Sequence, residues 1–215
     1  MKKSQILKYI YFLFLTVSIF LLVSCGFNQT IVLNFPDNID LGEVWIIEDV
    51  NCFTCGTGQK LVGRAKGEVS ISLPKGWYVE LKVDPEAVTQ LSALQNIDSS
   101  QIQSLDLSDS SISDDDLQYI SHLKLQELFL YNTSLTGKGF SYIKRDDTEW
   151  FHLGLRDCKN LKTQFFSHFK DWNDLSISLD HSNLDNEHAK NSIRTIICSD
   201  IADEKCDRKV SGEND

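Results

Sequence analysis

The stretch IQSLDLSDSSI, Ile102–Ile112, is written again 23 residues later as LQELFLYNTSL, Leu125–Leu135. In both copies an alternating L-x-L core is followed five residues on by another aliphatic residue. A third copy, WFHLGLRDCKNL, begins at Trp150, and weaker copies surround Leu81 and Ile177. The central aliphatic residues of the five copies lie at 81, 105, 128, 153 and 177, which is 23 to 25 residues apart. The chain therefore contains a sequence repeat.

Each copy predicts a short strand followed by a helical turn. The L-x-L alternation turns one face of a strand toward the core, and a later apolar pair three residues apart fits one face of a helix. Ser113 is expected to cap the helix with Asp116 completing a capping box, and Thr136 and Thr163 stand at the matching positions of the next two copies. Because one such unit cannot bury its own apolar face, the units must stack.

The period and the pattern L-x-x-L-x-L-x-x-[NCST]-x-L resemble the leucine-rich-repeat family. The resemblance covers residues 78–190 as about four to five repeats. It implies an α/β solenoid with a parallel β-sheet on its concave face and short helices on its convex face. Gly139 matches a glycine of the short bacterial repeats in this family, and Cys158 matches the inward-pointing polar position, so we expect a buried thiol there.

Residues 1–24 are typical of a secretory signal peptide, with Lys2 and Lys3 before an apolar run, Tyr9–Val23, that is short for a membrane helix of about 20 residues. Leu22-Val23-Ser24-Cys25 resembles the lipobox of bacterial lipoproteins, in which the cysteine becomes the lipidated N-terminus. This resemblance implies a lipidated N-terminus and tether at 25–29. It also implies a protein held at the bacterial cell envelope, on the outer membrane where the host has one. An uncleaved membrane helix is the alternative.

The repeats are flanked by two segments of different composition. Residues 30–77 contain short runs rich in Val and Ile (IVLNF, VWIIE, VSISL and, continuing past residue 77, YVELKV) broken by Gly and Pro. They predict a small β-rich module that caps the N-terminal end of the repeats. Residues 191–215 are expected to form a C-terminal cap, with the helix-like segment SIRTIICSDI, and a polar tail.

Export to an oxidising compartment makes Cys52 with Cys55, and Cys198 with Cys206, candidates for disulfides. The C-x-x-C spacing of Cys52 and Cys55 also fits a redox pair or half a zinc site. Its flanks lack the helix that lowers the pKa of a redox cysteine, and no second C-x-x-C completes four zinc ligands. The five histidines show no metal-binding spacing, and the aspartates around residue 114 fit helix capping better than a calcium loop. No cofactor is expected.

No catalytic motif occurs in the chain, so a non-enzymatic binding protein is the favoured interpretation. Without residues 1–24 the chain has 18 basic and 31 acidic residues, a net charge of −13, which disfavours nucleic acid as a partner.

The residues between the strand leucines are expected to face outward and to bind a protein or another macromolecule. Aromatic residues and arginine dominate such sites. The candidates are Asp106, Glu127, Phe129, Tyr131, His152 and Arg156. Three alternatives remain: a structural or assembly component of the envelope, a thiol or metal protein using Cys52 and Cys55, and coverage of the aromatic pair by the chain's own tail or an end module.

Overall fold

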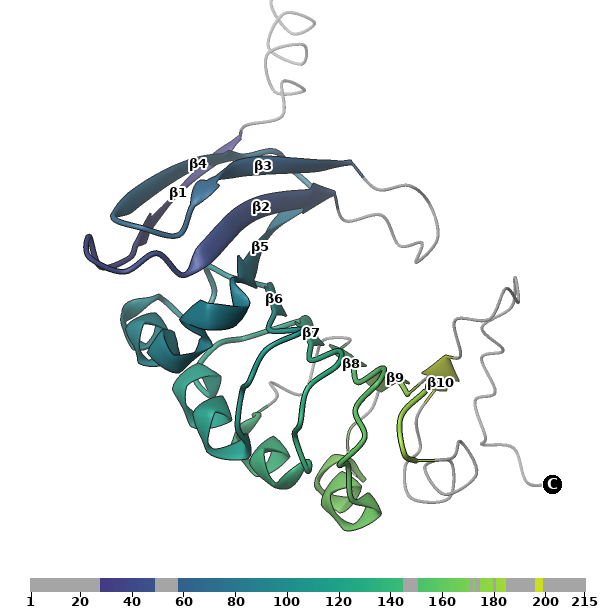
Figure 1. The fold of residues 1–215 in the computed structure, drawn as a ribbon. Coiled ribbons are helices and arrows are strands. Elements are labelled where there is room, and N and C mark those ends of the chain that lie inside the picture. The colour runs from purple at the N-terminus through teal and green to yellow at the C-terminus, as the bar shows by residue number, and fades with distance from the viewer. Residues whose placement is uncertain are drawn as a thin grey trace, which may run out of the picture.

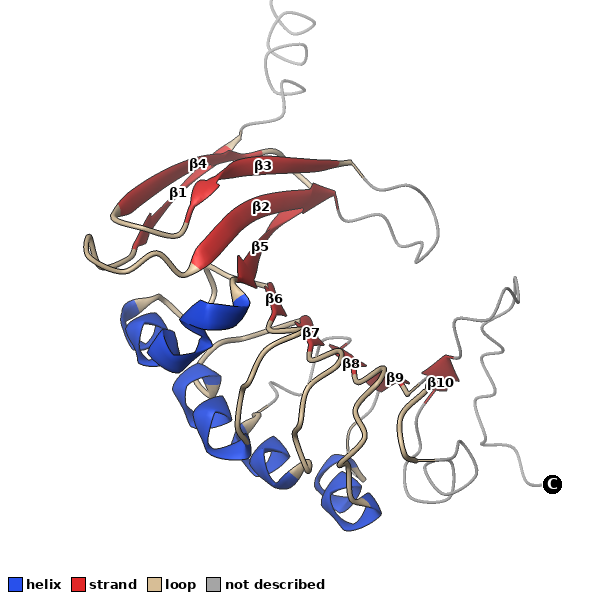
Figure 2. Cartoon of the chain, in the orientation of Figure 1, coloured by secondary structure: helices blue, strands red, loops and turns tan. Residues whose placement is uncertain are grey.

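The computed structural model describes residues 28–48, 58–144, 151–170, 172, 175–179, 181–184 and the backbone of 196–198. The expected signal peptide, Cys25, Cys52, Cys55 and Cys206 lie outside these residues, and so does the side chain of Cys198. The fold is of the mixed α/β class, a mostly parallel sheet with short 3₁₀ helices beside it (Figures 1 and 2). The strands are β1 (Gln29–Asn34), β2 (Gly42–Glu48), β3 (Gln59–Arg64), β4 (Glu68–Leu73), β5 (Trp77–Val83), β6 (Ser104–Asp106), β7 (Glu127–Phe129), β8 (Phe151–Gly154), β9 (Leu175–Ser178) and β10 (Ile196–Cys198), and the helices are η1 (Pro85–Asn96), η2 (Asp114–Ile120), η3 (Lys138–Tyr142) and η4 (Thr163–Phe169).

The first five strands are antiparallel and come from the segment in which the sequence predicts strands. β1 and β4 form a two-stranded sheet, while β2 pairs with both β3 and β5. The strands expected from the Val- and Ile-rich runs are confirmed as β1, β2, β4 and β5. Strand β3 was not predicted from the sequence, because its side chains are exposed or half-buried throughout and show no apolar alternation.

The parallel part of the sheet begins at β5 and places the repeated aliphatic residues side by side. Leu81 is in register with Leu105, and the pairing continues through Leu128 and Leu153 to Ile177. One eight-stranded sheet results, in the order β10-β9-β8-β7-β6-β5-β2-β3. Since β5 pairs antiparallel with β2 and parallel with β6, the sheet runs without a break across the boundary expected between residues 77 and 78.

The C-terminal segment expected to be helix-like contains a strand instead. Ile196–Cys198 pairs in parallel with β9 as β10. The expectation is wrong at these positions because β9 offers a free row of backbone groups, and isoleucine fits an extended strand better than a short helix. Tertiary pairing therefore outweighs the helical spacing read from the sequence.

A single core lies between the sheet and the helices and continues under the antiparallel strands. Leu105, Leu128 and Leu153 are fully buried, and each contributes about 2 kcal/mol by that burial. At the N-terminal end, Leu33 of β1 and Ile71 of β4 belong to the same cluster. The β1–β4 pair therefore covers the apolar face of β2 and β5. It lies on the same side of the sheet as the helices, which cover the apolar face of the parallel strands that follow.

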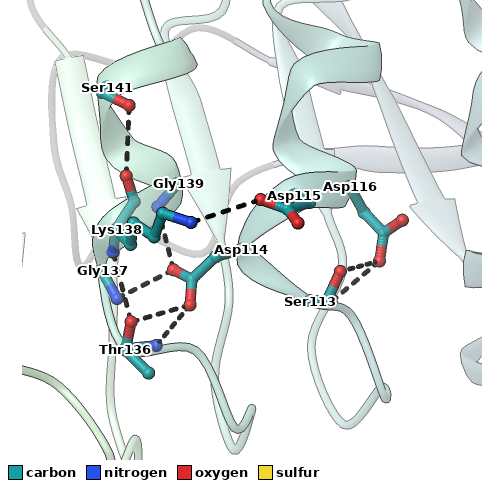
Figure 3. Close-up of polar contacts among 9 residues, drawn as sticks. All are labelled: Ser113, Asp114, Asp115, Asp116, Thr136, Gly137, Lys138, Gly139 and Ser141. Carbon is teal, nitrogen blue, oxygen red and sulfur yellow. Dashed lines mark hydrogen bonds and ion pairs between the residues drawn. The ribbon is translucent and has the colours of Figure 1, made fainter.

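The helix caps differ in part from those that the sequence suggests. Ser113 and Asp116 form the expected capping box, in which the Asp116 carboxylate accepts a hydrogen bond from the Ser113 N–H (2.9 Å). The same carboxylate also accepts from the Ser113 hydroxyl (2.6 Å) (Figure 3). The following helices instead begin after Gly137 and Lys162, so the prediction of Thr136 and Thr163 as caps is wrong.

The N-terminus of η3 is capped by a residue of the preceding helix. Asp114 Oδ1 accepts from the backbone N–H of Gly137 (3.0 Å) and of Gly139 (2.9 Å), and Oδ2 accepts from the Thr136 hydroxyl (2.8 Å) (Figure 3). The N–H groups at a helix start otherwise have no partner. Neighbouring units are therefore joined by polar groups on the helix side as well as by the sheet.

Candidate binding face

Helices cover only one face of the described parallel strands (Figure 2). The strand leucines are buried in the core beneath these helices, so the residues between them lie on the opposite face. Pairing of the strands arranges these residues in two rows. The first row holds Glu80, Ser104, Glu127, His152 and Ser176, and the second holds Lys82, Asp106, Phe129, Gly154 and Ser178.

The antiparallel strands extend this face beyond the predicted candidates. Trp45 of β2 is in register with Glu80 on one side and with Leu61 of β3 on the other, so the three side chains share one face. Trp45 donates a hydrogen bond from Nε1 to Glu43 (3.0 Å), and Leu61 is 46% exposed. We call the two rows together with Glu43, Trp45, Ile47, Leu61, Tyr78, Tyr131 and Arg156 the sheet face. Sequence reasoning missed the part on β2 and β3 because it treated that segment as a separate cap.

Several positions of the sheet face are buried, against expectation. Ser104, His152, Ser176 and Ser178 are all less than 4% exposed. The Nδ1 atom of His152 lies 3.2 Å from the Ser176 hydroxyl, and Nε2 lies 3.3 Å from the Ser178 hydroxyl. Burial, and to a smaller extent the charge of Arg156, lowers the pKa of His152 to about 4, so the imidazole is neutral near pH 7. His152 therefore supports its neighbours and does not itself face a partner.

Three of the predicted candidates, Phe129, Tyr131 and Arg156, lie together in the structure. The Phe129 and Tyr131 rings are 5.5 Å apart between centroids, and the Arg156 guanidinium carbon lies 4.3 Å from the centre of the Tyr131 ring. Phe129 also contacts the ring of His152, at 5.6 Å between centroids. All three side chains of this aromatic–arginine cluster are half-buried.

Gly154 leaves the space in which the cluster sits. A Cβ at this position would lie 2.5 Å from the Tyr131 ring and 2.9 Å from the Phe129 ring. Both rings therefore lie directly against the backbone of β8. The sequence contains this signal as a glycine inside a strand pattern, which indicates a close approach of another group.

A cavity of about 410 Å³ lies next to the cluster, just past the ends of the strands. Its walls include one residue that follows each of β6, β7 and β8 at the same place in the repeat, namely Asp109, Asn132 and Asp157, which all have a left-handed backbone (φ 57°, 51° and 58°). Asp and Asn adopt this conformation more readily than most residues. The remaining walls are Tyr131, Arg156 and Lys159. The sequence contains the signal for these three residues, because an Asp or Asn recurs two residues after the second leucine of each of the three copies.

The two remaining candidates lie next to the cluster, since Asp106 on β6 is in register with Phe129, and Glu127 precedes Phe129 by two residues on the same face of β7. Both carboxylates lie on the same side of Glu80 of β5, which accepts a hydrogen bond from the Ser104 hydroxyl (3.2 Å). Burial first, and then the charges of Asp106 and Glu127, raise the pKa of Glu80 to about 7. The Tyr78 hydroxyl lies 3.1 Å from the Glu127 carboxylate and donates to it. This part of the face is strongly acidic.

Other histidine and cysteine residues have structural partners. His122 lies 3.2 Å from the Ile97 carbonyl and His168 lies 3.0 Å from the Ile143 carbonyl, which links successive units. The Cys158 thiol is buried, as predicted, and donates to the Leu130 carbonyl (3.1 Å). Among the residues that the structure describes, no three His, Cys, Asp or Glu side chains are grouped so that they could hold a metal ion.

Comparison with known proteins does not place the chain in a family. No protein-family model matches the chain, and no curated protein or solved structure was found to match it. Within the described ranges, none of the helices has the length and apolar character needed to span a bilayer.

Proposed function

We propose that this chain is a leucine-rich-repeat lipoprotein of the bacterial cell envelope that binds another macromolecule, in the first place a protein, through its sheet face. The observation that carries the proposal is the aromatic–arginine cluster of Phe129, Tyr131 and Arg156, held against Gly154 beside a cavity of about 410 Å³. The few residues that carry most of the binding energy in protein interfaces are enriched in Trp, Tyr and Arg. A rigid cluster also loses little side-chain entropy on binding.

The leucine-rich-repeat assignment is supported by agreement between the sequence period and the strand register. Residues 23 to 25 apart in sequence are directly opposite one another in five parallel strands. The polar position after each strand has an equivalent role in successive copies, since the Ser110, Thr133 and Cys158 side chains all donate to a nearby strand-end carbonyl, that of Leu107 or Leu130. Repetition of contacts at the period of the sequence is what a stack of repeats requires.

Anchoring at the envelope is supported by the sequence around Cys25 and is tested by the mass of the mature protein. The full chain, produced in an exporting bacterium, is expected in the membrane fraction, with residues 1–24 removed and lipid attached to Cys25. A Cys25→Ala variant is expected to keep residues 1–24 and to carry no lipid. A wild-type protein that also retains residues 1–24 would instead favour an uncleaved N-terminal helix.

Binding through the sheet face is tested by capture from envelope extract with three immobilised proteins. They are the wild type, a Phe129→Glu/Tyr131→Glu variant, and a Tyr142→Glu control, which changes an exposed aromatic residue on η3. We expect a specific protein or glycan to be retained by the wild type and the control and lost by the double variant. Equal retention by all three proteins, with circular dichroism showing that each is folded, would contradict binding at the cluster.

A second candidate function is a structural or assembly role with the antiparallel strands as the contact. Leu61 favours it, because this leucine is 46% exposed on β3, at the edge of the eight-stranded sheet. A Leu61→Glu substitution distinguishes the two functions. Loss of the captured partner in Leu61→Glu, together with its retention in the Phe129→Glu/Tyr131→Glu variant, would move the site to β3.

A further inference from the structure

The cavity beside the aromatic–arginine cluster crosses three units of the parallel sheet. Asp109, Asn132 and Asp157, which we call the polar row, follow β6, β7 and β8 at the same place in the repeat and line the cavity. Backbone pairing continues into this row, because the Asp109 N–H donates to the Tyr131 carbonyl (2.8 Å). The Asn132 N–H donates in the same way to the Arg156 carbonyl (2.9 Å). Neighbouring members of the polar row are therefore about 4.8 Å apart, the spacing of paired strands.

The polar row is held in place from the core side. The residue after each member, Ser110, Thr133 or Cys158, donates a side-chain hydrogen bond to a strand-end carbonyl. Asn132 also donates from Nδ2 to Asp109 Oδ1 (2.9 Å), which joins neighbouring side chains. A row that is already ordered loses little conformational entropy when a ligand binds.

The walls of the cavity carry both hydrogen-bond donors and acceptors, and their charges cancel. The two carboxylates of Asp109 and Asp157 are balanced by the two cationic side chains of Arg156 and Lys159. The Lys159 ammonium lies 3.6 Å from the Asp157 carboxylate, so a donor and an acceptor are adjacent on the wall. Such walls favour no net charge in a ligand. They suit hydroxyl groups, because one hydroxyl can donate to a carboxylate and accept from an N–H at the same time.

The polar row is open to solvent. Asp109, Asn132, Asp157 and Lys159 are all exposed. Among the described residues, the one hydrogen bond of the Asn132 side chain is that donated by Nδ2, so its carbonyl oxygen can accept a hydrogen bond from a ligand. Exposed polar walls suit a ligand that is itself hydrated, and they disfavour an apolar one.

We propose that the cavity binds a neutral oligosaccharide in an extended conformation, with successive sugar units placed against Asp109, Asn132 and Asp157. The sugar units of an extended β-1,4-linked chain repeat at close to the spacing of paired strands, so each unit meets an equivalent residue of the stack. Tyr131 adds an aromatic wall against which the C–H groups of a sugar ring can pack. The proposal goes beyond the proposed function, because it gives the cavity a ligand of its own.

Calorimetric titration of the purified full chain, in a detergent without a sugar headgroup, tests the proposal. The probes are two neutral tetrasaccharides, cellotetraose and chitotetraose, with glucose as a short ligand and tetragalacturonate as an acidic one. We expect at least one neutral tetrasaccharide to bind. Glucose and tetragalacturonate are expected to bind at least about tenfold more weakly, because glucose reaches one unit only and the acidic chain is repelled by Asp109 and Asp157.

The cavity variant is Asp109→Gly/Asn132→Gly/Asp157→Gly, in which glycine keeps the left-handed backbone and removes the three side chains. His181→Gly is the matched control, because His181 has the same left-handed backbone (φ 56°) and lies outside the described walls of the cavity. We expect the Kd for the tetrasaccharide to rise at least about tenfold in the cavity variant and less than about twofold in the control. If circular dichroism shows that the triple variant does not fold, Asn132→Gly alone is expected to raise the Kd about threefold.

Three outcomes overturn the proposal. The first is that neither neutral tetrasaccharide binds to the wild type. The second is equal weakening in the cavity variant and the His181→Gly control, which would place the sugar elsewhere on the molecule. The third is tighter binding of tetragalacturonate than of both neutral probes, which would show that the cavity selects an anion.

Capture from envelope extract separates failure of this proposal from failure of the proposed function. A partner that the Phe129→Glu/Tyr131→Glu variant loses and the cavity variant retains, without tetrasaccharide binding by the wild type, leaves the proposed function standing and overturns the oligosaccharide site. Tetrasaccharide binding that only the cavity variant loses, together with equal capture by the wild type and the Phe129→Glu/Tyr131→Glu variant, supports the oligosaccharide site and contradicts binding at the cluster.

Discussion

The carboxylate of Asp114, on η2, accepts a hydrogen bond from the backbone N–H of Gly139, on η3, at 2.9 Å. The same carboxylate accepts from the N–H of Thr136 and of Gly137, so one side chain satisfies three backbone N–H donors at the start of the next helix (Figure 3). The consequence is that η3 depends on the preceding unit for its cap. Stacking of the units is therefore specified by polar contacts as well as by apolar burial.

Replacing Asp114 with alanine is expected to lower the free energy of unfolding by about 2 kcal/mol, because it leaves N–H groups at the start of η3 without a partner. Urea denaturation measures this change. The matched control is Asp115→Ala, which removes an exposed carboxylate 4.0 Å from Lys138 and is expected to change the free energy by less than about 0.5 kcal/mol. Equal effects of the two substitutions would show that Asp114 does not act as a cap.

A Gly139→Ala substitution is expected to destabilise the protein by about 3 kcal/mol. A Cβ on residue 139 would lie 2.1 Å from the Asp114 carbonyl oxygen, and η2 and η3 would have to separate to accommodate it. Gly63→Ala is the control, because a Cβ at that position meets no atom within 4 Å. Thermal denaturation of the two variants compares them directly, and a Gly139→Ala protein as stable as Gly63→Ala would rule out the close approach.

A Gly154→Ala substitution is expected to displace the aromatic–arginine cluster without unfolding the protein. The added methyl group would overlap the Tyr131 ring, which would have to move away from β8 and from its place beneath Arg156. We expect loss of the partner captured by the wild type and a change in near-ultraviolet circular dichroism, with the far-ultraviolet spectrum unchanged. Normal capture by this variant would mean that the position of Tyr131 is not important for binding.

Glu80 is expected to make the protein less stable as the pH rises from about 5 to 7. Its pKa is raised to about 7 in the folded state from an ordinary value of 4.5, so the folded state holds a proton that the unfolded state releases. Asp106, Glu127, Lys82 and the Ser104 hydroxyl face this carboxyl.

Comparison with Glu80→Gln isolates this contribution from those of the other acids. Between pH 5 and pH 8 the wild type is expected to lose roughly 2 kcal/mol relative to the variant. Denaturant unfolding at the two pH values provides the measurement, and Glu86→Gln serves as the exposed control. Wild-type and Glu80→Gln stabilities that change in parallel with pH would show that Glu80 is not protonated near neutral pH.

Sequence spacing was sufficient to predict the strand positions in the repeats and the residues that fill the core. Leu105, Leu128 and Leu153 recur at a regular interval because each must be buried at the same place in its unit. The sequence period therefore shows directly which residues fill the core. The candidates Phe129, Tyr131 and Arg156 followed from the same register. Strands β3 and β10 could not be predicted in this way. β3 is an exposed edge strand, and β10 forms by joining the existing edge of the sheet, so neither needs an apolar period of its own.

The sequence by itself determined the repeat, the alternation of buried and outward positions along each strand, and the excess of acidic charge, all of which are local or compositional properties. Only the tertiary structure decided that His152 is buried between Ser176 and Ser178, that Asp114 caps the next helix, and that Trp45 shares a face with Glu80. Each of these facts depends on which strand or helix lies beside another. These neighbours lie 22 to 35 residues apart in sequence and meet only when the chain packs. Short-range spacing in the sequence therefore cannot predict them.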